Sequence, residues 1–192
     1  MSIKVAINGF GRIGRCTLRA IYEQGLQNEF EVVAINASGD LTTNAHLLKY
    51  DTTHGRFATS VETEGEDCII IDGKKIPFYS TKDPKGVNWG SHGVDVLLEC
   101  TGAYTTKAKA QALLDQGARR VLISAPGGDD VDTTIVMGVN EEVLRGDMTV
   151  VSNASCTTNC LAPVAKILAD SVGIKQGLMT TIHAYTNDQV TV

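Results

Sequence analysis

The sequence predicts an α/β fold with a doubly wound, mostly parallel β-sheet. Short runs rich in valine and isoleucine alternate with helix-like segments along the 192 residues. Strands that alternate with helices are joined by crossover connections and therefore pair in parallel. A Gly-x-Gly-x-x-Gly pattern also stands between the first expected strand and the first expected helix. With 43% hydrophobic and 20% charged residues, the chain has the composition of an ordinary globular protein.

The strands and helices of this sheet are expected in alternation. Apolar runs predict strands at residues 3–7, 31–36, 94–100, 120–124 and 149–152. Helical periodicity predicts helices at residues 12–23, 44–50 and 106–116. The first of these helices has an apolar stripe that consists of Ile13, Cys16, Thr17, Ala20 and Ile21.

One segment departs from the alternation of strands and helices. Residues 61–79 are expected to form a hairpin, because Asp72-Gly73 separates the apolar run 67–71 from the run 74–79. An Asp-Gly pair favours a two-residue turn whose twist matches that of the flanking strands. This part of the sheet is therefore expected to be antiparallel.

Gly9, Gly11 and Gly14 form the glycine pattern, directly after the first strand and at the opening of the first helix. The first glycine permits a tight turn, the second lets a pyrophosphate approach the backbone, and the third lets helix and strand pack closely. The phosphates would rest on the helix N-terminus. In this context the pattern predicts a Rossmann-type domain that binds a dinucleotide. A glycine-rich turn in a domain that binds another ligand is the alternative.

The end of the second expected strand bears on the choice between NAD and NADP. An Asp or Glu at this point accepts hydrogen bonds from the adenosine ribose and repels a 2′-phosphate. Here Ala37 directly follows Asn36, and Ser38 offers a hydroxyl that suits a phosphate. The nearest acid, Asp40, comes three residues after Ala37. We therefore predict relaxed cofactor choice, with NADP accepted as well as NAD.

Charge and cysteine content exclude several classes of protein. The chain has 17 Lys and Arg against 22 Asp and Glu, a net charge of −5, and no basic block that would suit nucleic acid or an anionic membrane. No apolar run has the length of a membrane span, and the N-terminus lacks the layout of an export signal. The five cysteines are scattered and odd in number, so no disulfide framework is expected. The sequence therefore predicts a cytoplasmic protein without nucleic-acid or membrane partners.

A second domain is expected to begin at residue 152. Residues 1–151 account for the dinucleotide-binding domain, and residues 152–192 for the first part of an α+β catalytic domain. The sequence predicts a helix at about residues 157–171 and then a strand that ends at His183. A piece of about 40 residues is too small to bury a core unaided, so we expect this second domain to be truncated.

Cys156 stands among small hydroxyl and amide side chains where the helix of the second domain is expected to open. The positive end of a helix dipole lowers the pKa of a thiol at that position and raises its thiolate fraction. The hydroxyls of Ser155, Thr157 and Thr158 suit an oxyanion or a phosphate. A small buried cysteine in a capped helix is the alternative. No zinc site is expected at Cys156 and Cys160, because structural zinc sites use other spacings and usually four ligands.

Several stretches together resemble the phosphorylating glyceraldehyde-3-phosphate dehydrogenases. They are residues 7–15, 48–51, 54–57, 152–160 and 181–188. The nonapeptide Ser-Asn-Ala-Ser-Cys-Thr-Thr-Asn-Cys at residues 152–160 is specific to this family and its near relative, the erythrose-4-phosphate dehydrogenases. The resemblance runs from the first residues to the last and covers a little over half of such a protein.

The resemblance implies a glycolytic type of enzyme, a homotetramer that uses NAD or NADP and inorganic phosphate to convert glyceraldehyde 3-phosphate to 1,3-bisphosphoglycerate. Cys156 resembles the nucleophile of the family, and His183 resembles its general base. Positions similar to further cofactor contacts are Arg12, Ile13, Asn36, Lys82 and Ser124. Positions similar to phosphate-binding hydroxyls and to an acid near the substrate phosphate are Ser155, Thr157, Thr158, Thr186 and Asp188. Ala37 departs from the usual aspartate of the family and resembles NADP-accepting members.

The chemistry of these residue types fits the implied reaction. A thiolate that adds to an aldehyde gives a hemithioacetal, which donates hydride better than the aldehyde does. An imidazole with a pKa near neutrality suits the base. Two alternatives stay open, an erythrose-4-phosphate dehydrogenase and a non-catalytic dinucleotide-binding protein. The non-catalytic alternative applies chiefly to the 192-residue chain by itself, which we expect to be inactive. Residues 184–188 favour the triose-phosphate enzyme over the erythrose-4-phosphate dehydrogenase.

Overall fold

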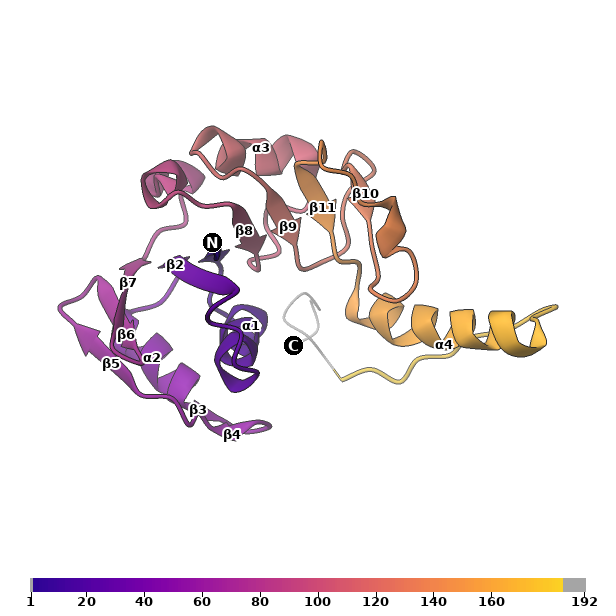
Figure 1. The fold of residues 1–192 in the computed structure, drawn as a ribbon, viewed down its shortest axis with the longest axis horizontal. Coiled ribbons are helices and arrows are strands. Elements are labelled where there is room, and N and C mark those ends of the chain that lie inside the picture. Colours follow the sequence, from indigo (N-terminus) through magenta and orange to yellow (C-terminus); the bar gives the residue numbers. More distant parts are fainter. Residues whose placement is uncertain (1, 185–192) are drawn as a thin grey trace.

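The computed structural model describes residues 2–184 and contains the predicted doubly wound α/β fold (Figure 1). Nine strands form one sheet in the order β10-β11-β9-β8-β1-β2-β7-β6-β5. Their bounds are β1 (Ile3–Asn8), β2 (Phe30–Asn36), β5 (Val61–Glu64), β6 (Cys68–Ile71), β7 (Lys74–Tyr79), β8 (Val96–Glu99), β9 (Val121–Ile123), β10 (Thr133–Thr134) and β11 (Val150–Ser152). A separate two-stranded sheet consists of β3 (Tyr50–Asp51) and β4 (Gly55–Arg56).

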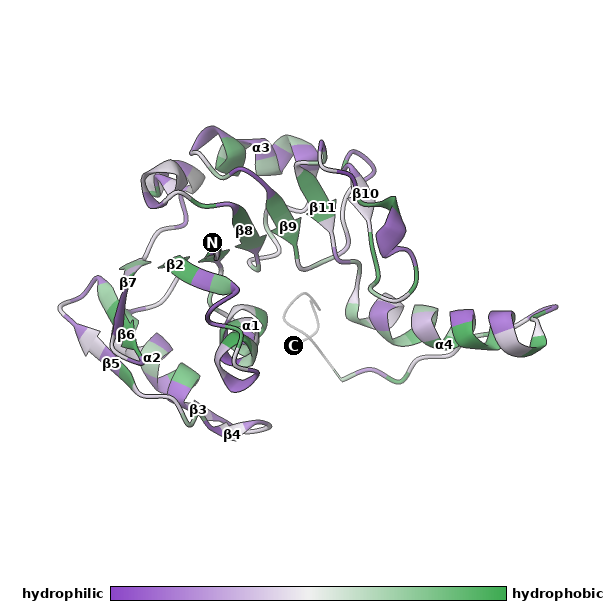
Figure 2. Ribbon diagram, viewed as in Figure 1, coloured by the Kyte–Doolittle hydropathy of each residue, from purple (hydrophilic) through white to green (hydrophobic). Residues whose placement is uncertain are grey.

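The helices are α1 (Arg12–Glu23), α2 (Leu41–Lys49), α3 (Lys107–Asp115) and α4 (Cys156–Val172). Short 3₁₀ helices lie at Pro84–Gly86, Trp89–His92 and Glu141–Val143. Two apolar clusters cover the sheet, and the neighbouring residues Ala6 and Ile7 of β1 belong to different clusters. This alternation places the clusters on opposite faces of the sheet. Ile7 packs with residues of α1 and α2, whereas Ala6 packs with residues of α3, and β8, β9 and β11 are strongly apolar (Figure 2).

The strand order reverses between β1 and β8. From β1 the chain continues to β2 and β7 on one side, and it then returns to β8, β9 and β11 on the other side. All pairs from β10 to β7 are parallel, whereas β5, β6 and β7 pair antiparallel. In an open parallel sheet, ligands bind at the carboxyl ends of the strands where the order reverses. Here that place lies between the residues that follow β1 and those that follow β8.

Helix α1 has the predicted bounds, and its apolar stripe is buried only in part: Ile21 is buried, and Cys16, Thr17 and Ala20 are half-buried. Ile13 is 52% exposed, and the other buried residues of the helix are Gly14, Leu18 and Arg19. Arg19 is buried because its guanidinium donates hydrogen bonds to the carbonyls of Leu48, His54 and Gly55 and pairs with Glu23. Arg19 is thus a buried polar residue whose partners come from a later segment of the chain.

Two local signals explain where other elements begin and turn. Helix α2 starts three residues earlier than predicted, because the Asp40 carboxylate accepts hydrogen bonds from the backbone N–H of Thr43 at 2.8 Å and from its hydroxyl at 2.7 Å. Such a cap satisfies a donor that the first turn of a helix leaves unpaired. The hairpin of β6 and β7 is confirmed, and Asp72 and Gly73 at its turn have φ angles of 52° and 75°.

Helix α4 extends away from the sheet, and none of its residues is buried (Figure 1). The chain then runs back along the helix as far as residue 184 without a strand, so the strand predicted to end at His183 is wrong within the described residues. A strand needs a pairing partner, and the nine-stranded sheet offers none beside this segment. No helix in residues 2–184 is long and apolar enough to cross a membrane. The boundary predicted after residue 151 falls inside β11 and stays a prediction.

Candidate functional site

A cleft of about 930 Å³ lies where the strand order reverses, and we call it the switch-point cleft. It is lined by the residues that follow β1, β2, β7 and β8. Eight of the residues predicted to hold the cofactor line it, namely Gly9, Gly11, Arg12, Ile13, Asn36, Ala37, Ser38 and Lys82. The cleft therefore gathers most of the predicted cofactor positions from three separate segments of the chain.

The three glycines differ in what they do. A Cβ added to Gly9 would lie 2.6 Å from the backbone carbon of Cys100, and the φ angle of Gly9 is +98°. A Cβ on Gly14 would lie 2.3 Å from the carbonyl oxygen of Gly9, so Gly14 serves the packing of α1 on β1 and does not line the cleft. A Cβ on Gly11 would meet nothing within 4 Å. The fold itself tolerates a side chain at Gly11, so the missing Cβ leaves room for a ligand in the cleft.

Replacing Gly9 with alanine is expected to lower the free energy of unfolding by about 2–4 kcal/mol, from backbone strain at positive φ together with the backbone clash. The matched control is Gly25→Ala, since Gly25 has a φ of +70° but open space around its Cα. That control should lose about 1 kcal/mol. Thermal and denaturant midpoints of the two variants in the intact protein measure the difference. Equal losses would contradict a role for the close approach of residues 9 and 100.

The N-terminus of α1 opens onto this cleft with free backbone donors. The other three α-helices carry capping side chains, Asp40 on α2, Thr106 on α3 and Ser155 on α4, whereas α1 has no side-chain cap. Uncapped N–H groups at the positive end of a helix dipole bind anions such as phosphate. Both the space at Gly11 and these donors fit the pyrophosphate of a dinucleotide.

The end of β2 presents no available carboxylate to the cleft. Ala37 is 4% exposed, and its N–H donates to the carbonyl of Tyr79 at 2.9 Å. Ser38 is exposed in the cleft. Asp40 uses its carboxylate to cap α2, and the hydrogen bonds from Thr43 hold the pKa of Asp40 below its usual range. Cofactor choice relaxed toward NADP stays a prediction.

The turn between β11 and α4 holds Cys156 at the first position of the helix. The Ser152 hydroxyl donates to the carbonyl of Ala125 at 2.7 Å and accepts from the N–H of Ala154 at 3.0 Å. Ala154 has a φ of 59°, a strained angle for a residue with a side chain, and such strain is common at functional sites. Ser155 caps the helix by accepting from the N–H of Thr158 at 2.9 Å. The turn is thus a rigid support for an exposed thiol.

Cys156 and His183 lie in direct contact, with 3.3 Å between Sγ and Nε2. The other ring nitrogen, Nδ1, lies 2.5 Å from the carbonyl oxygen of Ala184. A proton on Nδ1 satisfies that oxygen and leaves the Nε2 lone pair facing the thiol. The hydrogen bond with His183, followed by one with Thr157, lowers the pKa of Cys156 below its usual value. The pair can therefore exchange a proton and expose a thiolate.

The predicted phosphate-binding hydroxyls are placed only in part. The Thr157 hydroxyl makes a hydrogen bond with the Cys156 thiol, and the hydroxyls of Ser155 and Thr158 lie 2.7 Å apart. Thr186 and Asp188 lie outside the described residues. Neither Cys156 nor His183 lines the switch-point cleft. Because β1 and β11 are parallel to the strands between them, the turn that carries Cys156 follows the same edge of the sheet as the glycine loop.

Comparison with protein families matches residues 3–107 to the glyceraldehyde 3-phosphate dehydrogenase NAD binding domain. Residues 155–192 match the C-terminal domain of the same enzymes. The chain belongs to the glyceraldehyde-3-phosphate dehydrogenase family. It is 57% identical over 190 residues to the plasmid-encoded glyceraldehyde-3-phosphate dehydrogenase of Cupriavidus necator, and the aligned region covers 99% of this chain and 56% of that protein. It is 55% identical over 189 residues to the glyceraldehyde-3-phosphate dehydrogenase of Pseudomonas aeruginosa, with 98% and 56% covered. The chain thus spans little more than half the length of these curated relatives.

In this member of the glyceraldehyde-3-phosphate dehydrogenase family, Arg12 forms an ion pair with Asp51, a residue that was not predicted to belong to the site. The guanidinium of Arg12 donates to both carboxylate oxygens of Asp51, at 2.8 and 3.3 Å. Asp51 also accepts from the N–H groups of Thr53 and His54, and these bonds together hold its pKa far below the usual range. The ion pair orients Arg12 at the mouth of the cleft.

Two predicted cofactor contacts, Gly14 and Ser124, do not line the cleft. The Ser124 hydroxyl contacts the Cys100 thiol, and burial raises the pKa of that thiol to about 11. The cleft contains instead Thr101 and Tyr104, which the sequence analysis did not select. Their position shortly after a buried parallel strand at the switch point is the sequence feature that could have identified them as cleft residues. Within residues 2–184, no three His, Cys, Asp or Glu side chains gather as metal ligands would.

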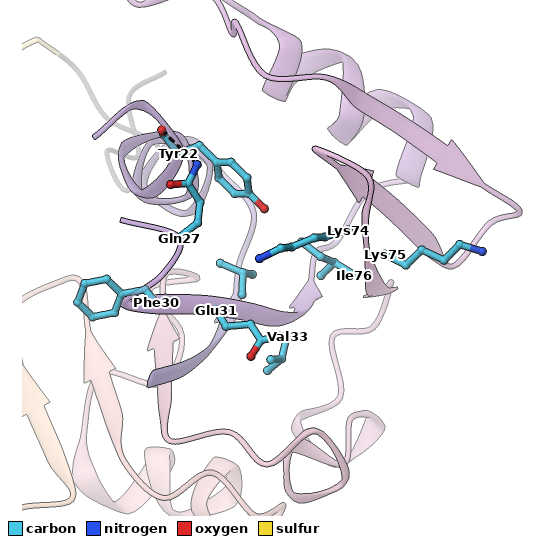
Figure 3. Close-up of a pocket in the computed structure, with 9 residues that line it drawn as sticks. Tyr22, Gln27, Phe30, Glu31, Val33, Lys74, Lys75 and Ile76 are labelled. Carbon is cyan, nitrogen blue, oxygen red and sulfur yellow. Dashed lines mark hydrogen bonds between the residues drawn. The ribbon is translucent and has the colours of Figure 1, made fainter. Parts of the chain in front are cut away.

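A second cavity, of about 380 Å³, lies between the end of α1 and the amino ends of β2 and β7. In Figure 3, the ring of Tyr22 lies opposite Lys74, Gln27 turns toward the backbone of Tyr22, and Phe30 and Glu31 come from β2. Strands β2 and β7 pair through their last two residues, which leaves this gap at their other ends. The cavity therefore lies at the opposite end of the strands from the switch-point cleft and contains none of the predicted site residues.

Proposed function

We propose that the intact protein is an NAD(P)-dependent phosphorylating dehydrogenase that converts glyceraldehyde 3-phosphate and phosphate to 1,3-bisphosphoglycerate. The observation that carries the proposal is the 3.3 Å contact between Cys156 Sγ and His183 Nε2 at the start of α4. The glycine loop on the same edge of the sheet and the names of the relatives support it.

Cys156 forms the covalent bond in this proposal. His183 takes the thiol proton, and the thiolate attacks the aldehyde carbon to give a hemithioacetal. His183 returns its proton to the developing oxyanion, and the hydroxyls beside Cys156 stabilise the negative charge on that oxygen. His183 then removes the proton of the hemithioacetal hydroxyl as hydride leaves the carbon, and a thioester forms. When bound, the nicotinamide ring supplies the acceptor for that hydride.

Inorganic phosphate completes the reaction. A phosphate oxygen attacks the thioester carbon and the Cys156 thiolate leaves, so that the acyl phosphate is released and the free thiolate is restored. The Thr157 hydroxyl, which contacts Cys156, and one hydroxyl of the Ser155–Thr158 pair donate to the incoming anion in this proposal. We assign Thr186 and Asp188 to the binding of the substrate phosphate on the resemblance alone.

A steady-state assay of the intact protein tests the proposed function. Glyceraldehyde 3-phosphate, phosphate and NAD or NADP should give reduced cofactor at a rate that depends on the phosphate concentration. Erythrose 4-phosphate serves as the comparison substrate and should be used less efficiently, because the relatives are named for the triose phosphate. Absence of phosphate dependence, or a preference for the tetrose, would overturn the proposal in this form.

Replacing Ala37 with aspartate is expected to lower kcat/KM with NADP by about 10- to 100-fold and to change kcat/KM with NAD less than about threefold. The new carboxylate would repel the 2′-phosphate of NADP and accept from the ribose hydroxyls of NAD. Parallel assays with the two cofactors measure the ratio, and Ser38→Ala is the companion variant that removes the neighbouring hydroxyl. An unchanged NADP efficiency in Ala37→Asp would place the 2′-phosphate elsewhere.

We also propose that the intact protein acts in the cytoplasm as a homotetramer, as the resemblance implies. The free state of Cys16, Cys68, Cys100, Cys156 and Cys160 in the structure fits a reducing compartment. The mass of the intact protein in solution tests the assembly, and a monomer at the assay concentration would contradict it.

A further inference from the structure

A buried carboxylate lies beneath the switch-point cleft and takes no part in the proposed chemistry. Glu99, at the end of β8, is 1% exposed. Its oxygens accept hydrogen bonds from the side-chain amide of Asn8 at 2.5 Å, from the N–H of Thr101 at 2.8 Å and from the hydroxyl of Thr101. Burial raises the pKa of this carboxyl, and the three hydrogen bonds oppose that rise. Burying a carboxylate is costly unless hydrogen bonds satisfy it.

The hydrogen bonds continue from Glu99 across the sheet. Asn8, at the end of β1, accepts from the amide nitrogen of Asn36, at the end of β2, over 2.8 Å. Asn36 also donates to the carbonyl of Thr81 at 3.0 Å and accepts from the N–H of Thr81 at 3.1 Å. Side-chain and backbone groups of four residues thus join the carboxyl ends of β8, β1 and β2 to the segment after β7.

This relay of hydrogen bonds has a fixed direction. The Thr81 N–H can only donate, so it holds the Asn36 oxygen, and the Asn36 nitrogen therefore faces the Asn8 oxygen. The Asn8 nitrogen is left to donate, and an ionised Glu99, which can only accept, receives that bond. Each amide orientation follows from the two ends, and an ionised acceptor makes a stronger hydrogen bond than a neutral one.

Most of the relay is part of the cleft lining. Asn8, Asn36, Thr81 and Thr101 line the cleft, whereas Glu99 does not. The backbone between Cys100 and Thr101 is also the part of the chain that a Cβ on Gly9 would touch, at 2.6 and 2.7 Å. A displacement of Thr101 would therefore be transmitted to the glycine loop.

We propose that Glu99 is a positioning residue for dinucleotide binding, which acts through Asn8 and Thr101 to hold the glycine loop and the segment after β8 at the spacing that the cofactor requires. The inference rests on the proposed function, because it takes the switch-point cleft to be the dinucleotide site. The side chain of Asn36 then serves the relay, since both of its N–H groups and its oxygen already have protein partners.

Two variants test the direction of the relay. In Glu99→Gln the new side chain has one acceptor group and one donor group, whereas Asn8 and Thr101 both donate to Glu99. As long as Thr81 fixes the orientation of Asn36, every orientation of the amides at positions 8 and 99 leaves one pair of donors facing each other. In the double variant Asn8→Asp with Glu99→Gln, the new carboxylate at position 8 accepts both from the new amide at position 99 and from Asn36, and every bond regains a donor and an acceptor. The matched control is Glu62→Gln, an exposed position on β5.

The measurement is the Kd for NAD⁺ of the intact protein, taken well below its unfolding temperature, together with turnover of glyceraldehyde 3-phosphate. Glu99→Gln should raise Kd about tenfold or more, and the double variant should return it to within about threefold of the parent, while Glu62→Gln leaves it unchanged. A merely structural role would lower the thermal midpoint and leave the Kd of the folded protein unmoved.

The outcomes separate the two proposals. An unchanged Kd in folded Glu99→Gln, or a double variant that binds no better than Glu99→Gln, overturns the relay. If Glu99→Gln does not fold, the double variant must both fold and bind, and its failure overturns the relay as well. Normal NAD⁺ binding without aldehyde turnover in the parent overturns the proposed function and leaves the relay standing. A parent that binds no NAD⁺ overturns both.

Discussion

Replacing Cys156 with serine is expected to abolish the dehydrogenase activity of the intact protein, with turnover reduced by about four orders of magnitude or more. The serine hydroxyl has a far higher pKa than the thiol, so the contact with His183 no longer yields an anion that adds to the aldehyde. Binding of NAD⁺ should persist, since Cys156 does not line the switch-point cleft. Steady-state turnover and the Kd for NAD⁺ measure the two effects separately.

Cys160 provides the matched control, because it lies one helical turn further along α4 and is also exposed. Cys160→Ser should keep nearly full activity. Limited alkylation followed by peptide mass mapping gives a second readout, since the thiolate is the reactive form and Cys156 contacts His183. If alkylation labels Cys160 and leaves Cys156 free while activity is lost, Cys160 is the nucleophile.

The parts of the fold that could be predicted from the sequence are those with a local cause. Helix α1 and the hairpin of β6 and β7 follow from the glycine pattern and from the Asp72-Gly73 turn. Strands β3, β4 and β10 were missed because each has two residues and no apolar run. The burial of Arg19 in α1 was missed because Arg19 takes its partners from residues 48–55, and periodicity within a helix carries no information on such partners.

The same limit separates the predictable and the hidden parts of the site. The position of Cys156 at a helix start depends on its immediate neighbours, so residues 152–160 were sufficient to predict it. Asp51 lies 39 residues from Arg12, and Glu99 lies 91 residues from Asn8. Contacts over such separations exist once the sheet has formed. Knowing which strands meet at the switch point would have directed attention to residues 99–104.

Replacing His183 with asparagine is expected to lower turnover by about 10²–10⁴-fold, the usual contribution of a general base, and to slow alkylation of Cys156. The hydrogen bond with His183 is the largest cause of the lowered Cys156 pKa, so the loss of this bond moves that pKa upward. The midpoint of the alkylation rate against pH should therefore move to higher pH, because less thiolate is present at any pH below the new pKa.

A matched control for this variant is His46→Asn, since His46 is exposed on α2 and contacts the ring of Tyr50. It should leave both the turnover and the alkylation profile of Cys156 unchanged. A His183→Asn variant with reduced turnover but an unshifted alkylation profile would show that His183 acts only after the thiolate has formed. A variant with normal turnover would remove His183 from the reaction, and the proton of the hemithioacetal hydroxyl would then need another acceptor within reach of Cys156.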